Sequence, residues 1–178
     1  MSAPPPLSGT RWEPLTQDAA ARGRAAVERL SQKNGPVFIN LSAGEFASFA
    51  LDSLLRGVSA GLAGAEALAR DDRLYVRAQV SVADLGGPKT LGPLSSLVAG
   101  KQELMLRGTL EVLRPGRAQF RVDEVALKEL KLPAAVIEKL LARVAMSDRD
   151  STVAPNGIPL RMPRVLADIR KWDIPAVA

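Results

Sequence analysis

Acidic pairs and one serine are the residues whose types and spacing could carry chemistry. The pairs are Asp71–Asp72, Asp123–Glu124 and Asp148–Asp150, and the serine is Ser42. Two carboxylates share a proton or a cation only when both face one site. The first and last pairs fall in predicted turns, where water solvates them, and the middle pair lies in a predicted strand, where neighbours point to opposite faces. The stretch "SDRDST" also has too few regularly spaced oxygen ligands for a calcium loop.

Ser42 is better explained as a helix cap than as a nucleophile. It stands three residues before Glu45 in the S-x-x-E pattern of a capping box, and Leu41 and Phe46 occupy the positions of a hydrophobic staple. This arrangement predicts a helix that starts at Ala43. The serine is therefore assigned to local structure.

The chain has no cysteine and no histidine. This excludes disulfides, thiolate metal sites and catalysis through Ser-His-Asp or Cys-His groups. We therefore predict that the protein is not an enzyme, has no catalytic residues, binds no metal and uses no cofactor. Function has to be inferred from architecture.

Composition describes a globular domain with an aliphatic interior. Of 178 residues, 47% are hydrophobic and 24% charged, but only 4% are aromatic. A core of leucine, valine, isoleucine and alanine suits plain packing or a cavity for acyl chains. No apolar run is long enough to span a membrane, and the first residues do not resemble a secretory signal. We expect residues 1–15 to be a linker-like segment and residues 16–178 a single α+β domain.

The net charge of +5 is spread over both ends of the chain and forms no basic stripe. A nucleic-acid partner is therefore not expected. The densest basic group is a C-terminal one, and it either aids solubility or contacts anionic headgroups at a membrane surface. It consists of Arg161, Arg164, Arg170 and Lys171. Trp12 and Trp172 are interpreted as side chains that pin the chain ends, with interfacial anchoring as the alternative.

The N-terminal half predicts a peripheral helix over Thr16–Gln32, a short strand over Val37–Leu41 and the capped helix from Ala43. That helix carries Phe46, Phe49, Ala50, Leu54 and Val58 at helical spacing. From Arg73 to Ala83 apolar and polar residues alternate, which indicates a strand with one face wet.

A hairpin is predicted over Leu104–Val125, with Gly108 in mid-strand and a reversal at Arg114-Pro115-Gly116. Residues 84–101 form a long Gly/Pro-rich connection that contains the apolar residues Leu94, Leu97 and Val98. We interpret it as a surface loop, with a membrane-touching tip or a lid as alternatives.

In "LKLPAAVIEKLL" the hydrophobic period changes at Pro133, which we place at the first position of an amphipathic helix ending near Met146–Ser147. Residues 147–163 read as a polar loop, and residues 164–178 as a short helix running into a last strand.

The order "INLSAGEF", "DDRLYVRAQV" and "GKQELMLRGTLEVLRPGRAQFRVDEVALKELKLPAAVIEKLL" resembles bacterial envelope proteins similar to tubular lipid-binding (TULIP, or BPI-like) domains. The resemblance covers about residues 37–144. It implies a curved antiparallel sheet packed around or against one or two amphipathic helices, with an aliphatic groove for acyl chains and no catalytic residues. In this chain the corner before the helix reads Leu130-Lys131-Leu132-Pro133, with one proline and no glycine.

Two functions follow as hypotheses. The first is a non-enzymatic domain of the bacterial cell envelope that binds lipid or another apolar ligand. Its groove candidates are Phe46, Phe49, Leu54, Val76, Val80, Leu106, Leu110, Phe120, Ile137, Leu140 and Leu141. The alternative is a structural or scaffolding domain that holds an envelope protein partner. We expect a periplasmic or other extracytoplasmic location, with anchoring through a segment absent from this chain, while a cytoplasmic location stays open.

Overall fold

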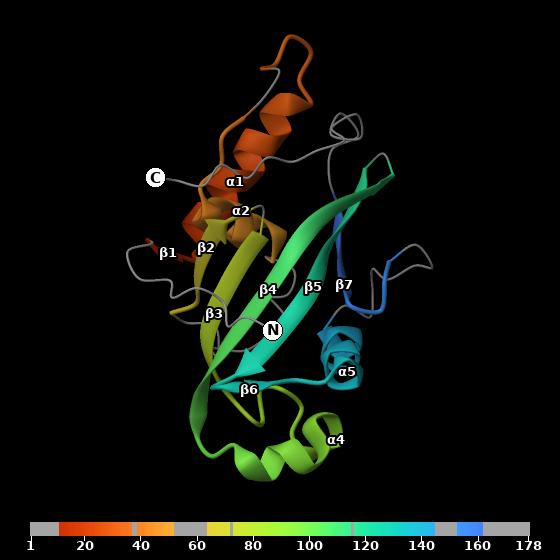
Figure 1. Ribbon diagram of the computed structural model, residues 1–178. Helices are drawn as coiled ribbons and strands as arrows, with labels where there is room; N and C mark the ends of the chain where they lie inside the picture. The colour runs from red at the N-terminus through yellow and green to blue at the C-terminus, as the bar shows by residue number, and fades with distance from the viewer. Residues whose placement is uncertain are drawn as a thin grey trace.

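The structure is a computed structural model that describes residues 11–36, 39–51, 64–71, 73–114, 116–144 and 153–161. It is an α+β fold around a seven-stranded antiparallel sheet (Figure 1). The strands are β1 (Glu13–Pro14), β2 (Glu66–Arg70), β3 (Arg73–Ser81), β4 (Lys101–Arg114), β5 (Arg117–Leu127), β6 (Leu130–Lys131) and β7 (Gly157–Arg161). Their order is β1-β2-β3-β4-β5-β6, and β7 pairs with β5 as well. The predicted α+β class and antiparallel sheet are confirmed.

Strand β3 follows the predicted alternation. Leu74, Val76, Ala78 and Val80 are buried, whereas the residues between them are half-buried or exposed. Because side chains alternate across a strand, one face of the sheet, here called the inner face, carries the apolar core. The opposite, outer face carries the polar residues.

The predicted hairpin is confirmed as β4 and β5. A register shift at Arg107/Gly108 marks a bulge, because Arg107 pairs with Glu124 while Gly108 pairs with Val122. At Gly108 an added Cβ would lie 2.7 Å from the Phe120 ring and would overlap the carbonyl oxygen of Arg121. The glycine therefore lets the Phe120 ring pack directly over β4.

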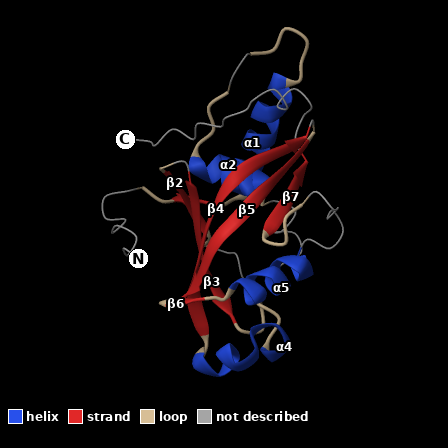
Figure 2. Cartoon of the chain, turned by 45° about the vertical axis from the view of Figure 1, so that its right-hand side comes forward, coloured by secondary structure: helices blue, strands red, loops and turns tan. Residues whose placement is uncertain are grey.

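Two N-terminal helices pack against each other at one end of the sheet (Figures 1 and 2). The first, α1 (Gln17–Leu30), is capped by the Thr16 hydroxyl, close to the predicted limits. The second, α2 (Ala43–Ala50), has the predicted capping box. The Ser42 hydroxyl accepts from the Glu45 N–H at 3.1 Å, and the Ser42 N–H donates to the Glu45 carboxylate at 3.2 Å.

The opposite end carries α4 (Pro88–Leu91), the 3-10 helix η1 (Gly92–Leu97) and α5 (Ala134–Val144) (Figure 2). The connection predicted as a loop therefore contains two short helices. The amphipathic helix is confirmed, with one difference at its start. Pro133 precedes the first helical residue, and its carbonyl accepts from the N–H groups of Val136 and Ile137.

Several short elements were not predicted or were predicted wrongly. The predicted strand at 37–41 is wrong in its described part, since Ile39–Leu41 is irregular. The loop predicted over 147–163 contains β7. Pro159 had suggested that no strand forms there, but β7 pairs with β5 on one side only, and such an edge strand tolerates proline. Strands β1, β2 and β6 were also missed. The C-terminal helix and strand predicted over 164–178 and the helix end near 146–147 lie outside the described residues.

Candidate functional site

The register brings many of the predicted groove residues onto the inner face. Leu106 of β4 lies between Val76 of β3 and Val125 of β5, and Leu110 lies opposite Phe120. These residues belong to one apolar cluster that also includes Val80. The alternation of the strands alone predicts this shared face.

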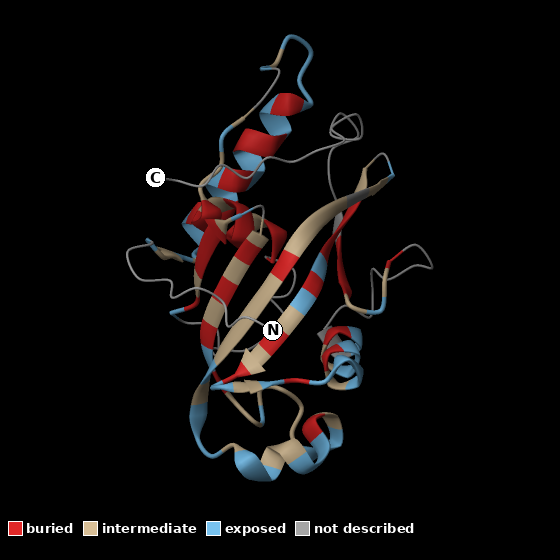
Figure 3. Ribbon diagram, viewed as in Figure 1, coloured by how far each residue is buried: buried red, intermediate tan, exposed pale blue. Residues whose placement is uncertain are grey.

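Burial on this face is uneven. The inward residues of β3 and β5 are nearly inaccessible, for example Val80 at 4% and Phe120 at 1% exposed. Leu104, Leu106 and Leu110 of β4, here called the inner leucine row, are only half-buried. Figure 3 shows the same contrast, with β4 in the intermediate colour over most of its length. Because β4 is flanked by long strands on both sides, its leucines would be expected to be the most buried.

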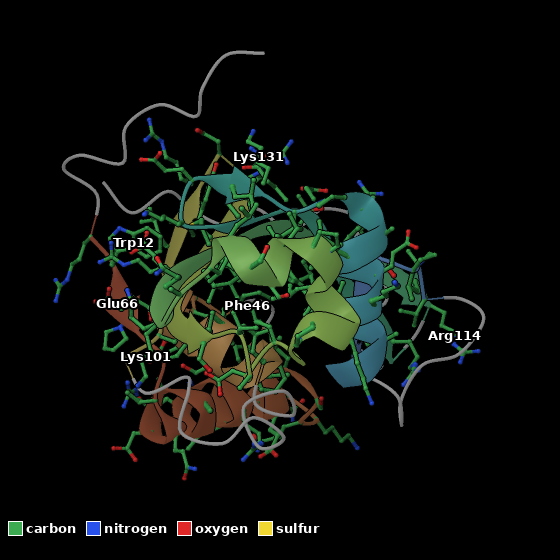
Figure 4. All side chains as sticks on the ribbon, turned by 90° about the horizontal axis from the view of Figure 1, so that it is seen from below. Trp12, Phe46, Glu66, Lys101, Arg114 and Lys131 are labelled. Carbon is green, nitrogen blue, oxygen red and sulfur yellow. The ribbon has the colours of Figure 1, made fainter. Side chains whose placement is uncertain are left out.

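Helices from both ends of the sheet contribute to the same apolar cluster. From α2, Phe46 is buried and Phe49 is half-buried. From α5, Ile137 and Leu141 are buried, while Leu140 is half-buried. Figure 4 shows Phe46 in the interior, with Lys131 and Arg114 at the periphery. The candidate groove residues that the structure describes are thus brought together.

The remaining candidates are not placed. Leu54, Arg164, Arg170 and Lys171 lie outside the described residues. Arg161 is in β7, but its side chain is not described. The predicted headgroup contacts therefore stay a prediction.

The outer face carries ion pairs that sequence reasoning missed. Arg77 donates to Glu66 at 2.7 Å and lies 4.2 Å from the centroid of the Trp12 ring. Arg73 pairs with Asp123 at 2.7 Å. The only signal in the sequence was alternating charge along the strands, which does not identify partners. These pairs fix the strands and the N-terminal segment in register, which favours pinning as the role of Trp12.

The prediction that Asp123 and Glu124 point to opposite faces is wrong. The bulge leaves Asp123 without an opposite residue, so both side chains reach the outer face. They enter separate ion pairs, Asp123 with Arg73 and Arg121, and Glu124 with Lys131 at 3.2 Å. Each carboxylate is thus neutralised by its own cations, as expected of a structural role.

Chemistry beyond apolar contact has little support among the described residues. No group of three acidic side chains there could hold a metal ion. The pKa of Asp84 is lowered, chiefly by hydrogen bonds from the backbone and the hydroxyl of Ser81, and this carboxylate lies at a turn. The inner face offers dispersion and hydrophobic contact to a ligand.

No family model, curated protein or solved structure matches the chain. Among the described residues, no helix combines the length and the apolar character needed to cross a membrane. A functional inference therefore depends on the geometry of the inner face.

Proposed function

We propose that this chain is a non-enzymatic domain that binds lipid or another apolar ligand over the inner leucine row. The observation that supports the proposal is the half-burial of Leu104, Leu106 and Leu110 between strands whose inward side chains are buried. Apolar surface left partly uncovered at the centre of a sheet favours a ligand that covers it.

The dimensions of the row suit an extended hydrocarbon chain. Leu104 and Leu110 are six residues apart on β4, which at the rise of a strand is roughly 20 Å. Each methylene group removed from water contributes about 0.8 kcal/mol. A fatty acyl chain along the row would therefore bind without any charged contact, and a headgroup would remain free to face solvent.

An envelope location and a kinship to tubular lipid-binding domains belong to the same proposal. They are supported by the order of the capped helix, the alternating strand, the hairpin and the amphipathic helix. The positive charge of the C-terminal basic group would favour binding at an anionic membrane surface. A lipid extracted from a membrane would be the natural ligand in such a setting.

The decisive experiment is native mass spectrometry after gentle purification, combined with titration of a fluorescent long-chain fatty acid. We expect a co-purified lipid or micromolar binding of the probe. Leu106→Trp would fill the row with an apolar side chain and should weaken probe binding by about tenfold or more. Met105→Trp is the matched control. Met105 is next to Leu106 on β4, but its side chain lies on the outer face, where it pairs with Arg77 and Ala126.

Failure to detect both lipid and probe binding in the wild-type protein would refute the proposal. Equal weakening by the two tryptophan variants would also contradict it, because the effect would then not be specific to the inner face. Circular dichroism of both variants shows whether each retains the fold.

A scaffolding function is the second candidate, and it is favoured by Leu97. This side chain on η1 is 71% exposed, and among the described residues it is the one large hydrophobic side chain classed as exposed. A partner protein of an envelope assembly could bind there. A pull-down with the full chain and with a variant lacking residues 88–97 separates the two functions. Loss of a partner by the variant, with lipid binding retained, favours the scaffold.

A further inference from the structure

The connection between β3 and β4 is far longer than the topology requires. Neighbouring antiparallel strands can be joined by two residues, yet residues 82–100 intervene between Ser81 and Lys101, which pair directly. This connection, here called the strap, contains α4 and η1. Its two ends, residues 82–87 and 98–100, are here called the stalk and adjoin the end of β4 nearest Leu104. Long ordered connections of this kind are often functional.

The strap is held down by apolar side chains. Leu91 is 1% exposed, and α4 contacts α5. Leu85, Leu94 and Val98 are half-buried against the same apolar cluster that contains Leu104 and Leu106. Apolar side chains of the strap and of α5 therefore pack against the same cluster as the inner leucine row.

The hydrogen bonds described for the strap are local. The Leu85 N–H donates to the carbonyl of Ser81 and the Gly87 N–H to that of Val82. The Ser95 and Ser96 hydroxyls donate to carbonyls three residues earlier, and the Gln102 side chain donates to Ala99. Rotation at Gly87 and Gly100 would break only one of these bonds, the exposed one from Gln102 to Ala99. Opening of the strap therefore costs mainly the exposure of a few leucines.

Both ends of the strap have glycines in conformations that side chains disfavour. Gly87 and Gly100 each have a φ of 66°, and a Cβ at either position would meet no atom within 4 Å. Glycine is therefore required there for the backbone path and not for space. Such positions are suited to act as hinges, because glycine passes between conformations that other residues reach only with strain.

We propose that the strap is a gate over the Leu104 end of the inner leucine row, closed by Leu91 and opened by rotation at its glycine-containing ends. This inference rests on the proposed binding of an apolar ligand. A fatty acid would enter and leave when Leu91 leaves its buried position and Leu94 and Val98 lift from the cluster, and closure would return these side chains to cover the bound chain.

The test compares two leucines of the same strap. Leu91→Ala removes the buried anchor, so the association and dissociation rates of a fluorescent long-chain fatty acid, followed by stopped flow, should both rise by about tenfold or more. Their ratio, the Kd, should change less than either rate. Leu97→Ala, at an exposed position, should leave both rates within about twofold of wild type.

Limited proteolysis gives an independent readout of opening. Lys89 is exposed within α4, and trypsin can cut after it only when the helix opens. Cleavage there should be faster in Leu91→Ala than in wild type or Leu97→Ala, and saturating fatty acid should slow it. Thermal unfolding of each variant verifies that the rest of the domain is folded.

Probe binding by the wild type with unchanged rates in Leu91→Ala would overturn the gate and leave the binding function standing. A rise in the dissociation rate alone would also overturn it, because Leu91 would then be a wall of the site. Absence of probe binding to the wild type would overturn both proposals.

Discussion

The two helical ends of the sheet are held in different ways. At the α1–α2 end, polar groups join separate elements. The Glu13 carboxylate on β1 accepts from the Gly44 N–H at 2.7 Å, at the N-terminus of α2, where negative charge is favoured. The Thr16 N–H donates to the buried Ser48 hydroxyl at 3.1 Å. Directional contacts of this kind fix α1, α2 and the sheet relative to one another.

At the α4–α5 end the contacts between elements are mostly apolar. Ile137 and Leu141 of α5 and Leu91 of α4 are buried, whereas the hydrogen bonds described for these helices are local. The chain before α5 is tied to the sheet, because the Leu132 N–H donates to the Val125 carbonyl at 2.8 Å. Beyond that point the helices rest on the sheet through their side chains.

The α1–α2 end is therefore expected to be rigid, and the α4–α5 end to be adaptable. Hydrogen bonds specify distance and angle, while hydrophobic contact is non-directional and tolerates sliding. An apolar ligand can replace apolar contacts at little cost, but it cannot replace a buried hydrogen bond. Under the proposed function, ligand exchange would therefore occur at the α4–α5 end, and the α1–α2 end would be its fixed support.

The largest effect should come from forcing the fixed end apart. Gly23 is buried where α1 crosses α2, and a Cβ there would lie 2.8 Å from the Glu45 carbonyl oxygen. We expect Gly23→Leu to lower the free energy of unfolding by about 2 kcal/mol or more, because backbone cannot yield as a side chain would. Urea denaturation measures this. Ala25→Leu, on the exposed side of α1, should change it by less than about 0.5 kcal/mol.

A pair of serines sharpens the contrast between the ends. Ser48→Ala removes the acceptor that joins α2 to the start of α1 and should cost about 1–2 kcal/mol, since a part-buried N–H loses its partner. Ser96→Ala removes a hydroxyl bonded to its own strap, at Pro93, and should cost less than about 0.5 kcal/mol. Equal losses in urea denaturation would show that the strap is as firmly fixed as the α1–α2 end.

The elements that could be predicted from sequence are those whose stability is local. The alternation of β3, the hairpin β4–β5, the Ser42–Glu45 capping box and the amphipathic α5 each carry their signal within their own residues. The strands β1, β2, β6 and β7 have two to five residues each and owe their conformation to a partner strand. No local pattern identifies such strands.

The candidate site was predictable in membership but not in exposure. Alternation placed Val76, Leu106, Leu110 and Phe120 on one face. The difference between half-buried Leu106 and buried Val76 depends on which helix lies over each strand, and that is set by tertiary packing. The bulge that places Asp123 and Glu124 on one face could likewise not be predicted from the sequence, because it depends on the pairing of β5 with β4.

The smallest effect concerns the stalk of the strap and depends on pH. The Asp84 carboxylate accepts from the Ser81 N–H and hydroxyl, both at 2.8 Å, and these bonds lower its pKa below the ordinary 3.8. A carboxylate with a lowered folded pKa stabilises the folded state above its unfolded pKa, and this contribution is lost as the pH falls through the folded pKa. Lys101 adds a smaller favourable interaction with the ionised form.

Asp84→Asn should therefore be less stable than wild type in urea at about pH 7, and the difference should shrink as the pH falls below 3.8 and through the lowered folded pKa. Glu129→Gln is the matched control for loss of one negative charge, since Glu129 is an exposed residue in the turn between β5 and β6. A difference for Asp84→Asn that persists unchanged in acid would show that the amide distorts the turn, and that the charge of Asp84 does not stabilise the stalk. The start of the strap would then be held to β3 by hydrogen bonds that do not depend on this charge, such as those from the Asp84 N–H to the Ser81 hydroxyl and from the Leu85 N–H to the Ser81 carbonyl.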